Sequence, residues 1–170
     1  MTRTAWFERR FHFQLPPENH HDVVVRLIGT PLRLRELCRG LARPRATARI
    51  DGTWSIQENV GHLLDLEPLW TGRIDDLLGG ADVLRAADLQ NRATHDAHHN
   101  DRELPALLEA FANARAAFVQ RLRGLQAPDF ARSARHPRLD QPMRMIDHCV
   151  FVAEHDDHHL GRILQLLGGP

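Results

Sequence analysis

Hydrophobic residues recur every three or four positions in four long stretches of the chain, and polar segments separate these stretches. This spacing is typical of amphipathic α-helices that each bury one face. The predicted helices lie within residues 20–41, 54–80, 101–125 and 143–167. No run of residues gives a convincing strand, and no internal repeat is present. The pattern therefore predicts an all-α fold, a four-helix bundle with long inter-helix loops.

Local signals predict how the helices begin. Thr30 and Pro31 interrupt the first helical pattern, which predicts a restart with Thr30 as the cap and Pro31 in its first turn. Ser55 followed by Glu58 is a capping-box pattern at the start of the second helix. Asn100, with a glutamate three residues later, predicts a similar cap for the third helix.

The remaining segments are predicted to be an arm and loops. Residues 1–17 form an N-terminal arm, and its aromatic side chains are expected to cover part of the core: Trp6, Phe7, Phe11 and Phe13. Residues 43–53, 81–99 and 126–141 are predicted loops. A length of 170 residues predicts a single domain spanning 1–170.

The balance of charge and the composition argue against some classes of binding partner. Basic and acidic residues number 22 each, so no net field favours nucleic acid or an anionic membrane. An arginine-rich run at 33–49 is interpreted as a solvated helix end and loop rather than a phosphate-binding patch. Cys38 and Cys149 are isolated thiols, no signal peptide is visible, and no apolar run is long enough to cross a bilayer. We expect a cytoplasmic protein with no nucleic-acid or membrane partner.

The fourth helix carries the densest candidate chemistry, in the run EHDDHHLGRI at 154–163. His155 and His159 fall on the same stripe as the core residues of this helix, and an i,i+4 pair of imidazoles can chelate one ion. His158 can also pair with His155 at i,i+3, so it is a rival second ligand. Asp156 and Asp157 point away from the stripe and are expected to face solvent or to bind a ligating histidine.

A third ligand is expected from a facing helix. His62 lies on an otherwise apolar stretch of the second helix, where burial without a partner is costly. His62, His155 and His159 could converge inside the bundle and leave positions open for water or substrate, as in catalytic metal sites. The alternative is that they are ordinary core or surface histidines, since the chain contains 12 and the pair lacks the glutamate of an HExxH motif. Residue chemistry alone leaves both interpretations open.

The sequence gives less evidence for the roles of three further groups of residues. Glu58 is expected to be the capping-box partner, and the alternative is contact with a ligating histidine or an acid–base role. The histidines of the 94–101 segment are expected to be solvated or to line the mouth of a pocket. Speculative substrate contacts are His158, Arg162, His95, His98 and His99.

The sequence resembles the DinB/YfiT-like superfamily of metal-dependent bundles. The resemblance lies in the stretches at 29–41, 54–70 and 154–166. It implies that His62, His155 and His159 are the ligands and that His158 is not. It also implies a divalent ion, commonly nickel or zinc, whose coordination shell is completed by water. Because dimers are common in the family, it further implies a homodimer.

The resemblance is less specific about the reaction. It implies a small-molecule substrate and an S-transferase that uses a low-molecular-weight thiol such as bacillithiol, mycothiol or glutathione. A metal with an open position can lower the pKa of a bound thiol and make it a nucleophile. The same ion could activate water, so a metal-dependent hydrolase is the alternative. A non-enzymatic, metal-binding stress-response bundle is a further alternative.

Overall fold

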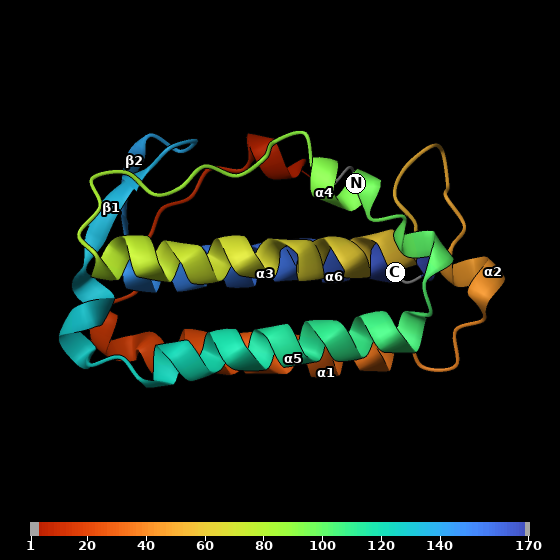
Figure 1. Cartoon of the computed structure of the whole chain (residues 1–170), viewed down its shortest axis with the longest axis horizontal. Coiled ribbons are helices and arrows are strands. Elements are labelled where there is room, and N and C mark those ends of the chain that lie inside the picture. The colour runs from red at the N-terminus through yellow and green to blue at the C-terminus, as the bar shows by residue number, and fades with distance from the viewer. Residues whose placement is uncertain (1–3, 169–170) are drawn as a thin grey trace.

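The computed structural model describes residues 4–168 and confirms the four-helix bundle (Figure 1). The long helices are α1 (His20–Leu37), α3 (Ile56–Leu78), α5 (Leu104–Arg123) and α6 (Met145–Leu166). Helix α1 packs against α5 and α6, and α3 packs against the same two helices. Helices α1 and α3 therefore occupy opposite corners, and the α3–α6 layer lies over the α5–α1 layer.

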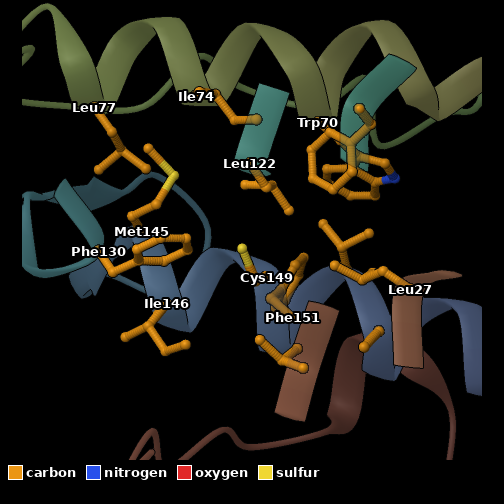
Figure 2. Packing of buried hydrophobic residues seen from close by; sticks show 14 of the residues in the cluster. Leu27, Trp70, Ile74, Leu77, Leu122, Phe130, Met145, Ile146, Cys149 and Phe151 are labelled. Carbon is orange, nitrogen blue, oxygen red and sulfur yellow. The ribbon is translucent and has the colours of Figure 1, made fainter. Parts of the chain in front are cut away.

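The apolar stripes of the four helices meet between these two layers. Figure 2 shows Leu27 of α1, Ile74 of α3 and Leu122 of α5 around Ile146 and Cys149 of α6. All five side chains are buried, as the helical spacing predicted. A second cluster fills the rest of the bundle, and its fully buried members are Leu34, Ala46, Val60, Leu63, Leu107, Phe111 and Ile163.

Shorter elements connect the long helices. Helix α2 (Arg43–Ala46) lies in the first connection and α4 (Arg92–Asp96) in the second. Single 3₁₀ turns occur at Trp6–Glu8, Pro17–Asn19, His99–Asp101 and Ala127–Ala131.

A small hairpin corrects the prediction that the chain has no strand. Strands β1 (Ser133–His136) and β2 (Gln141–Arg144) pair antiparallel, with Ala134 opposite Met143. Each strand has only four residues and mixes charged with apolar side chains, so neither gives a recognisable alternation. The predicted loop at 81–99 joins this hairpin, because the amide of Leu84 donates to the carbonyl of Arg135.

Of the three predicted helix starts, the structure confirms one and contradicts two. The Ser55–Glu58 capping box is present, with the Glu58 carboxylate accepting from the Ser55 amide. The restart at Thr30 is wrong, because α1 runs through Pro31 and the Thr30 hydroxyl donates to Asp156 of α6. The cap at Asn100 is also wrong: α5 begins four residues later, and the Asn100 side chain accepts a hydrogen bond from the Ser55 hydroxyl.

The N-terminal arm lies over the α3–α6 layer, on the side away from α1 and α5 (Figure 1). Of the predicted arm, residues 1–3 lie outside the described part of the chain. The rings of Trp6 and Phe11 each contact Phe151 of α6, and Phe13 stacks on Phe11. Phe7 is 54% exposed, so it covers the core only in part. The arm therefore roofs one face of the bundle.

The helices and the two cysteines can be compared with the sequence-based expectations. Within residues 4–168, every helix is too short or too polar to span a membrane. Cys38 and Cys149 are free thiols in the interior, and burial raises their pKa values to about 11 and about 12. Both thiols are thus held in their protonated, unreactive form.

Candidate functional site

The three histidines singled out from the sequence come together between α3 and α6. One ligand nitrogen from each of His62, His155 and His159 lies within 4.8 Å of the other two. All three side chains are buried. They meet at the face of the α3–α6 layer beneath the arm, rather than in the core between the two layers. The predicted convergence is therefore found, displaced toward the surface of the bundle.

A chain of hydrogen bonds orients His62. The Thr94 hydroxyl donates to Asp65 at 2.8 Å, so its oxygen accepts from Nδ1–H of His62 at 2.9 Å. This leaves Nε2 of His62 unprotonated and available as a ligand. Nε2–H of His99 donates to the same Asp65 oxygen at 2.8 Å, and His99 packs directly on the backbone of Gly61. The chain thus runs from one imidazole to another through α4 and α3.

An amide orients His159 in the same way. The Asn59 side-chain nitrogen donates to the backbone carbonyls of Ser55 and Trp54, so its oxygen faces Nδ1 of His159 at 2.8 Å. Nδ1–H of His159 donates to that oxygen, so Nε2 is the ring nitrogen that would bind an ion. Hydrogen bonding of the second ring nitrogen is the usual way in which proteins fix the tautomer of a metal-binding histidine.

His155 is held by aromatic rings instead. Trp6 and Trp70 contact its ring edge-on at 5.0 and 5.5 Å between centroids. Nδ1 of His155 is buried and has no hydrogen-bond partner among the described residues. A buried ring nitrogen without a partner is costly, and an ion coordinated there would offset that cost. The donor set and its burial therefore fit a divalent cation.

Burial also keeps two of these imidazoles, those of His62 and His155, neutral. It lowers the pKa of His62 to about 4, although Asp65 raises it in part. Burial lowers the pKa of His155 well below its ordinary value, and the neighbouring His62 adds to the effect. Neutral imidazole is the form that binds metal ions.

A cavity of about 510 Å³ adjoins the three histidines. Helices α3 and α6 form its floor, and the arm, residues 86–91 and the turn of the hairpin enclose it. Its apolar wall consists of Trp6, Phe7, Trp54, Leu66, Trp70 and Phe151. A volume of this size accommodates a small organic molecule together with the open positions of an ion.

The speculative substrate contacts divide into two groups. His158 and Arg162 line the cavity, and the Arg162 guanidinium also donates to the Thr53 hydroxyl. His95, His98 and His99 do not line it. His95 and His98 are exposed, whereas His99 is buried behind α3, where it supports Asp65.

The acidic residues near the site have roles in the scaffold. Glu58 closes the capping box and binds Arg49, and these hydrogen bonds outweigh burial to lower its pKa to about 2. The expectation that Asp156 faces solvent or binds a ligating histidine is wrong, since it is fully buried and binds Arg115. Asp157 is half-exposed and pairs with Arg26 and Arg33 of α1.

Comparison with known proteins agrees with this architecture. A model of the DinB superfamily matches residues 26–163. The chain belongs to the DinB superfamily. The match spans α1 to α6 and so includes all three histidines of the site. No curated protein sequence matches this DinB-superfamily chain.

One solved structure shares the fold over nearly the whole chain. YfiT from Bacillus subtilis matches with a TM-score of 0.75 and 17% sequence identity, covering 95% of each chain. That protein is described as a probable metal-dependent hydrolase with an unusual four-helix bundle topology. The corner-to-corner placement of α1 and α3 is one departure from a simple up-and-down order.

Sequence reasoning missed most residues that surround the histidines. Thr94, Asn59 and Asp65 orient the ligands, but a single threonine, asparagine or aspartate carries no recognisable pattern. Arg73 and His136 line the cavity from α3 and β1. The one available signal was Arg73 itself, a charged residue between apolar neighbours of an amphipathic helix.

Proposed function

We propose that this protein is a divalent-metal-dependent enzyme for a small-molecule substrate, with His62, His155 and His159 as the ligands of nickel or zinc. The observation that carries the proposal is the convergence of three buried imidazole nitrogens within 4.8 Å at the wall of a cavity. Three protein ligands with adjoining free space is the arrangement of catalytic rather than structural sites. The adjoining cavity therefore favours an enzyme over a non-enzymatic metal-binding bundle.

The bound ion would supply a Lewis acid that lowers the pKa of water or a thiol at its open position. The protein's own residues do the rest. Thr94 and Asn59 hold two imidazoles in the ligating tautomer. Trp6, Trp54 and Trp70 exclude bulk water from the cavity and so strengthen electrostatic interactions within it.

Hydrolysis is the first candidate reaction, in which water adds to an electrophilic carbon and the leaving group departs with a proton. It agrees with the description of YfiT, which shares the fold. Transfer of a low-molecular-weight thiol is the second candidate, in which the thiol sulfur bonds to an electrophilic carbon, the bond from that carbon to its leaving group breaks, and the leaving group departs with the thiol proton. The cavity of about 510 Å³ favours it, because that space can hold a thiol beside an electrophile.

The deciding experiment measures metal content by elemental analysis of untagged protein purified without chelators. Wild type is compared with His62→Ala and with His98→Ala, an exposed histidine of the neighbouring loop. We expect near-stoichiometric nickel or zinc in wild type and His98→Ala, and loss of metal in His62→Ala. Absence of metal from wild type after reconstitution, or equal content in His62→Ala, would contradict the proposal. Ester-hydrolysis and thiol-conjugation assays on the loaded protein then separate the two reactions.

A further inference from the structure

Two arginines line the same cavity at a distance from the histidines. Arg73 lies eleven residues after His62 on α3, which is about 16 Å along the helix axis. The indole of Trp70 lies between the two regions: its ring is 5.5 Å from the Arg73 guanidinium and 5.5 Å from the His155 ring. Arg138, in the hairpin turn, also lines the cavity.

The side chain of Arg73 is held in place without an acidic partner. It is 1% exposed, and two of its nitrogens donate to the backbone carbonyl of Arg85 at 3.1 Å. A third nitrogen, Nη1, lies 3.1 Å from Nε2 of His136. The nearby carboxylate of Asp76 is engaged by the amide and guanidinium of Arg85. At least two guanidinium N–H groups remain to donate, because arginine has five N–H donors and these contacts take up at most three of them.

The burial of the Arg138 guanidinium is offset by fewer polar contacts than that of Arg73. Its guanidinium lies over the rings of Phe7 and Phe151, and its Nη2 is buried with no hydrogen-bond partner among the described residues. Burial lowers the pKa of Arg138, and it lowers that of Arg73 to about 10 although Asp76 opposes the shift. Neither arginine forms an ion pair within residues 4–168, whereas sixteen other pairs there join a basic group to a carboxylate.

His136 does not offset the positive charge of the cavity region that Arg73 and Arg138 line. Its Nδ1 accepts from the amides of Arg138 and Leu139, and its Nε2 lies beside Nη1 of Arg73. A doubly protonated ring would lose the two hydrogen bonds at Nδ1, and burial beside Arg73 lowers the pKa of His136 to about 3. The neutral imidazole packs against Arg73 and introduces no negative charge.

We propose that Arg73 and Arg138 bind an oxyanionic group of the substrate, such as a carboxylate, while the reacting bond of the same molecule lies at the three histidines. Two partly desolvated guanidiniums without a counter-ion are unfavourable in an apolar cavity, and an oxyanion relieves that cost with charge-assisted hydrogen bonds. The inference rests on the proposed function, because the anion belongs to the molecule on which that site acts. The substrate is then a small molecule with an anionic group at one end and the reacting bond at the other. The indole of Trp70 lies between the regions of the cavity that these two ends would occupy.

The test uses full-length, zinc-reconstituted protein and three probes of matched shape: phenylacetate, its neutral amide phenylacetamide, and benzylphosphonate. All three tryptophans of the chain line the cavity, so tryptophan fluorescence reports binding, with calorimetry as the second measurement. Arg138→Gln removes the less buried guanidinium. Arg135→Gln is the matched control, because Arg135 belongs to the same hairpin but is exposed and pairs with Asp140.

We expect wild type and Arg135→Gln to bind phenylacetate about tenfold or more tightly than the amide, which is the size of effect that hydrogen bonds to a charged group produce. Arg138→Gln should reduce that preference to within about twofold. Preference for benzylphosphonate over phenylacetate would assign the oxyanion as a phosphate-like group. Equal binding of anionic and neutral probes by wild type, binding of none, or an unchanged preference in Arg138→Gln would overturn the inference.

Two further measurements separate this inference from the proposed function. The probes are also titrated into chelator-treated protein, where a carboxylate cannot bind the ion, and the preference should persist there. The metal content of each variant is measured in the same samples. Retained metal without an anion preference would refute only the anion site, whereas an anion preference in wild type that holds no metal even after reconstitution would refute only the proposed metalloenzyme.

Discussion

Arg115 of α5 and Asp156 of α6 form a fully buried ion pair, and Asp156 is the immediate neighbour of His155. The same guanidinium binds Glu67 of α3 at 2.6 Å, and the Thr30 hydroxyl of α1 donates to Asp156. One buried network therefore joins all four long helices and fixes the rotation of α6 about its axis. That rotation directs His155 and His159 to the cavity.

Removing Arg115 should strongly destabilise the bundle. Arg115→Ala leaves Glu67 and Asp156 in the core without their counter-charge, which typically costs about 3–5 kcal/mol. Urea denaturation measures the free energy of unfolding. Arg121→Ala on the same helix is the control, because it removes an exposed pair with Asp75 and should cost less than about 1 kcal/mol. Similar losses in both variants would contradict the role of the network.

Thr94 should affect metal affinity more than stability. Thr94→Val removes the oxygen that accepts from Nδ1–H of His62 and breaks the link to Asp65. Loss of such an orienting hydrogen bond lowers metal affinity by about 10- to 100-fold. Competition with a chromophoric chelator measures the affinity. Thr47→Val, at the C-terminal end of α2, should leave it unchanged, and equal affinities in all three proteins would refute the orienting role.

The backbone of Gly61 should tolerate no side chain. A Cβ there would lie 2.2 Å from ring atoms of His99, so Gly61→Ala displaces a buried imidazole and should cost about 1–3 kcal/mol. Gly29→Ala, in α1 with free space around it, should instead stabilise by up to about 1 kcal/mol. In a His99→Ala background the cost of Gly61→Ala should largely disappear. Additive costs in the double variant would show that His99 is not the obstacle.

His148 should make stability depend on pH. Burial lowers its pKa to about 3, while the unfolded chain titrates near the ordinary 6.5. As the pH falls below 6.5, the unfolded state binds a proton that the native state does not, so the free energy of unfolding decreases by about 1.4 kcal/mol per pH unit. This loss continues toward pH 3, where the native histidine is also protonated.

The variant His148→Gln isolates that contribution. It keeps an N–H donor for the carbonyl of Trp70, which Nε2 of His148 faces at 3.0 Å, and it removes the titrating ring. Urea midpoints in the presence of chelator, from about pH 7 to pH 4, should therefore decline less steeply in the variant than in wild type. Parallel pH profiles would show that His148 has the same pKa in the folded and the unfolded protein.

The bundle was predictable because its long helices carry unambiguous periodicity. The helix containing His62 and the helix containing His155 and His159 each bury one stripe, which made their convergence one of two open interpretations. The family resemblance favoured convergence, and the three ligand nitrogens do meet. The hairpin around Ala134 was not predictable, because four-residue strands are too short to show alternation. The homodimer remains a prediction, since an apolar stripe that forms a core looks in sequence like one that forms an interface.

The surroundings of the site were harder to predict for a different reason. Asp156 has the same sequence context as Asp157, and only its partner Arg115, 41 residues away, makes it a core residue. Arg73 and Arg138 are two of 22 basic residues, and their lack of acidic partners is visible only in three dimensions. Tertiary contacts, rather than local pattern, give these residues their roles.

The roof of the cavity has a consequence for how this family can diversify. The three histidines belong to α3 and α6, whereas Trp6, Phe7 and Arg138 come from the arm and the hairpin turn, which pack on the bundle without forming its core. Substitutions, insertions or replacements in the arm and the hairpin turn can therefore change the shape of the cavity while the helices that carry the imidazoles stay as they are. Relatives could in this way retain one reactive centre and accept unrelated substrates.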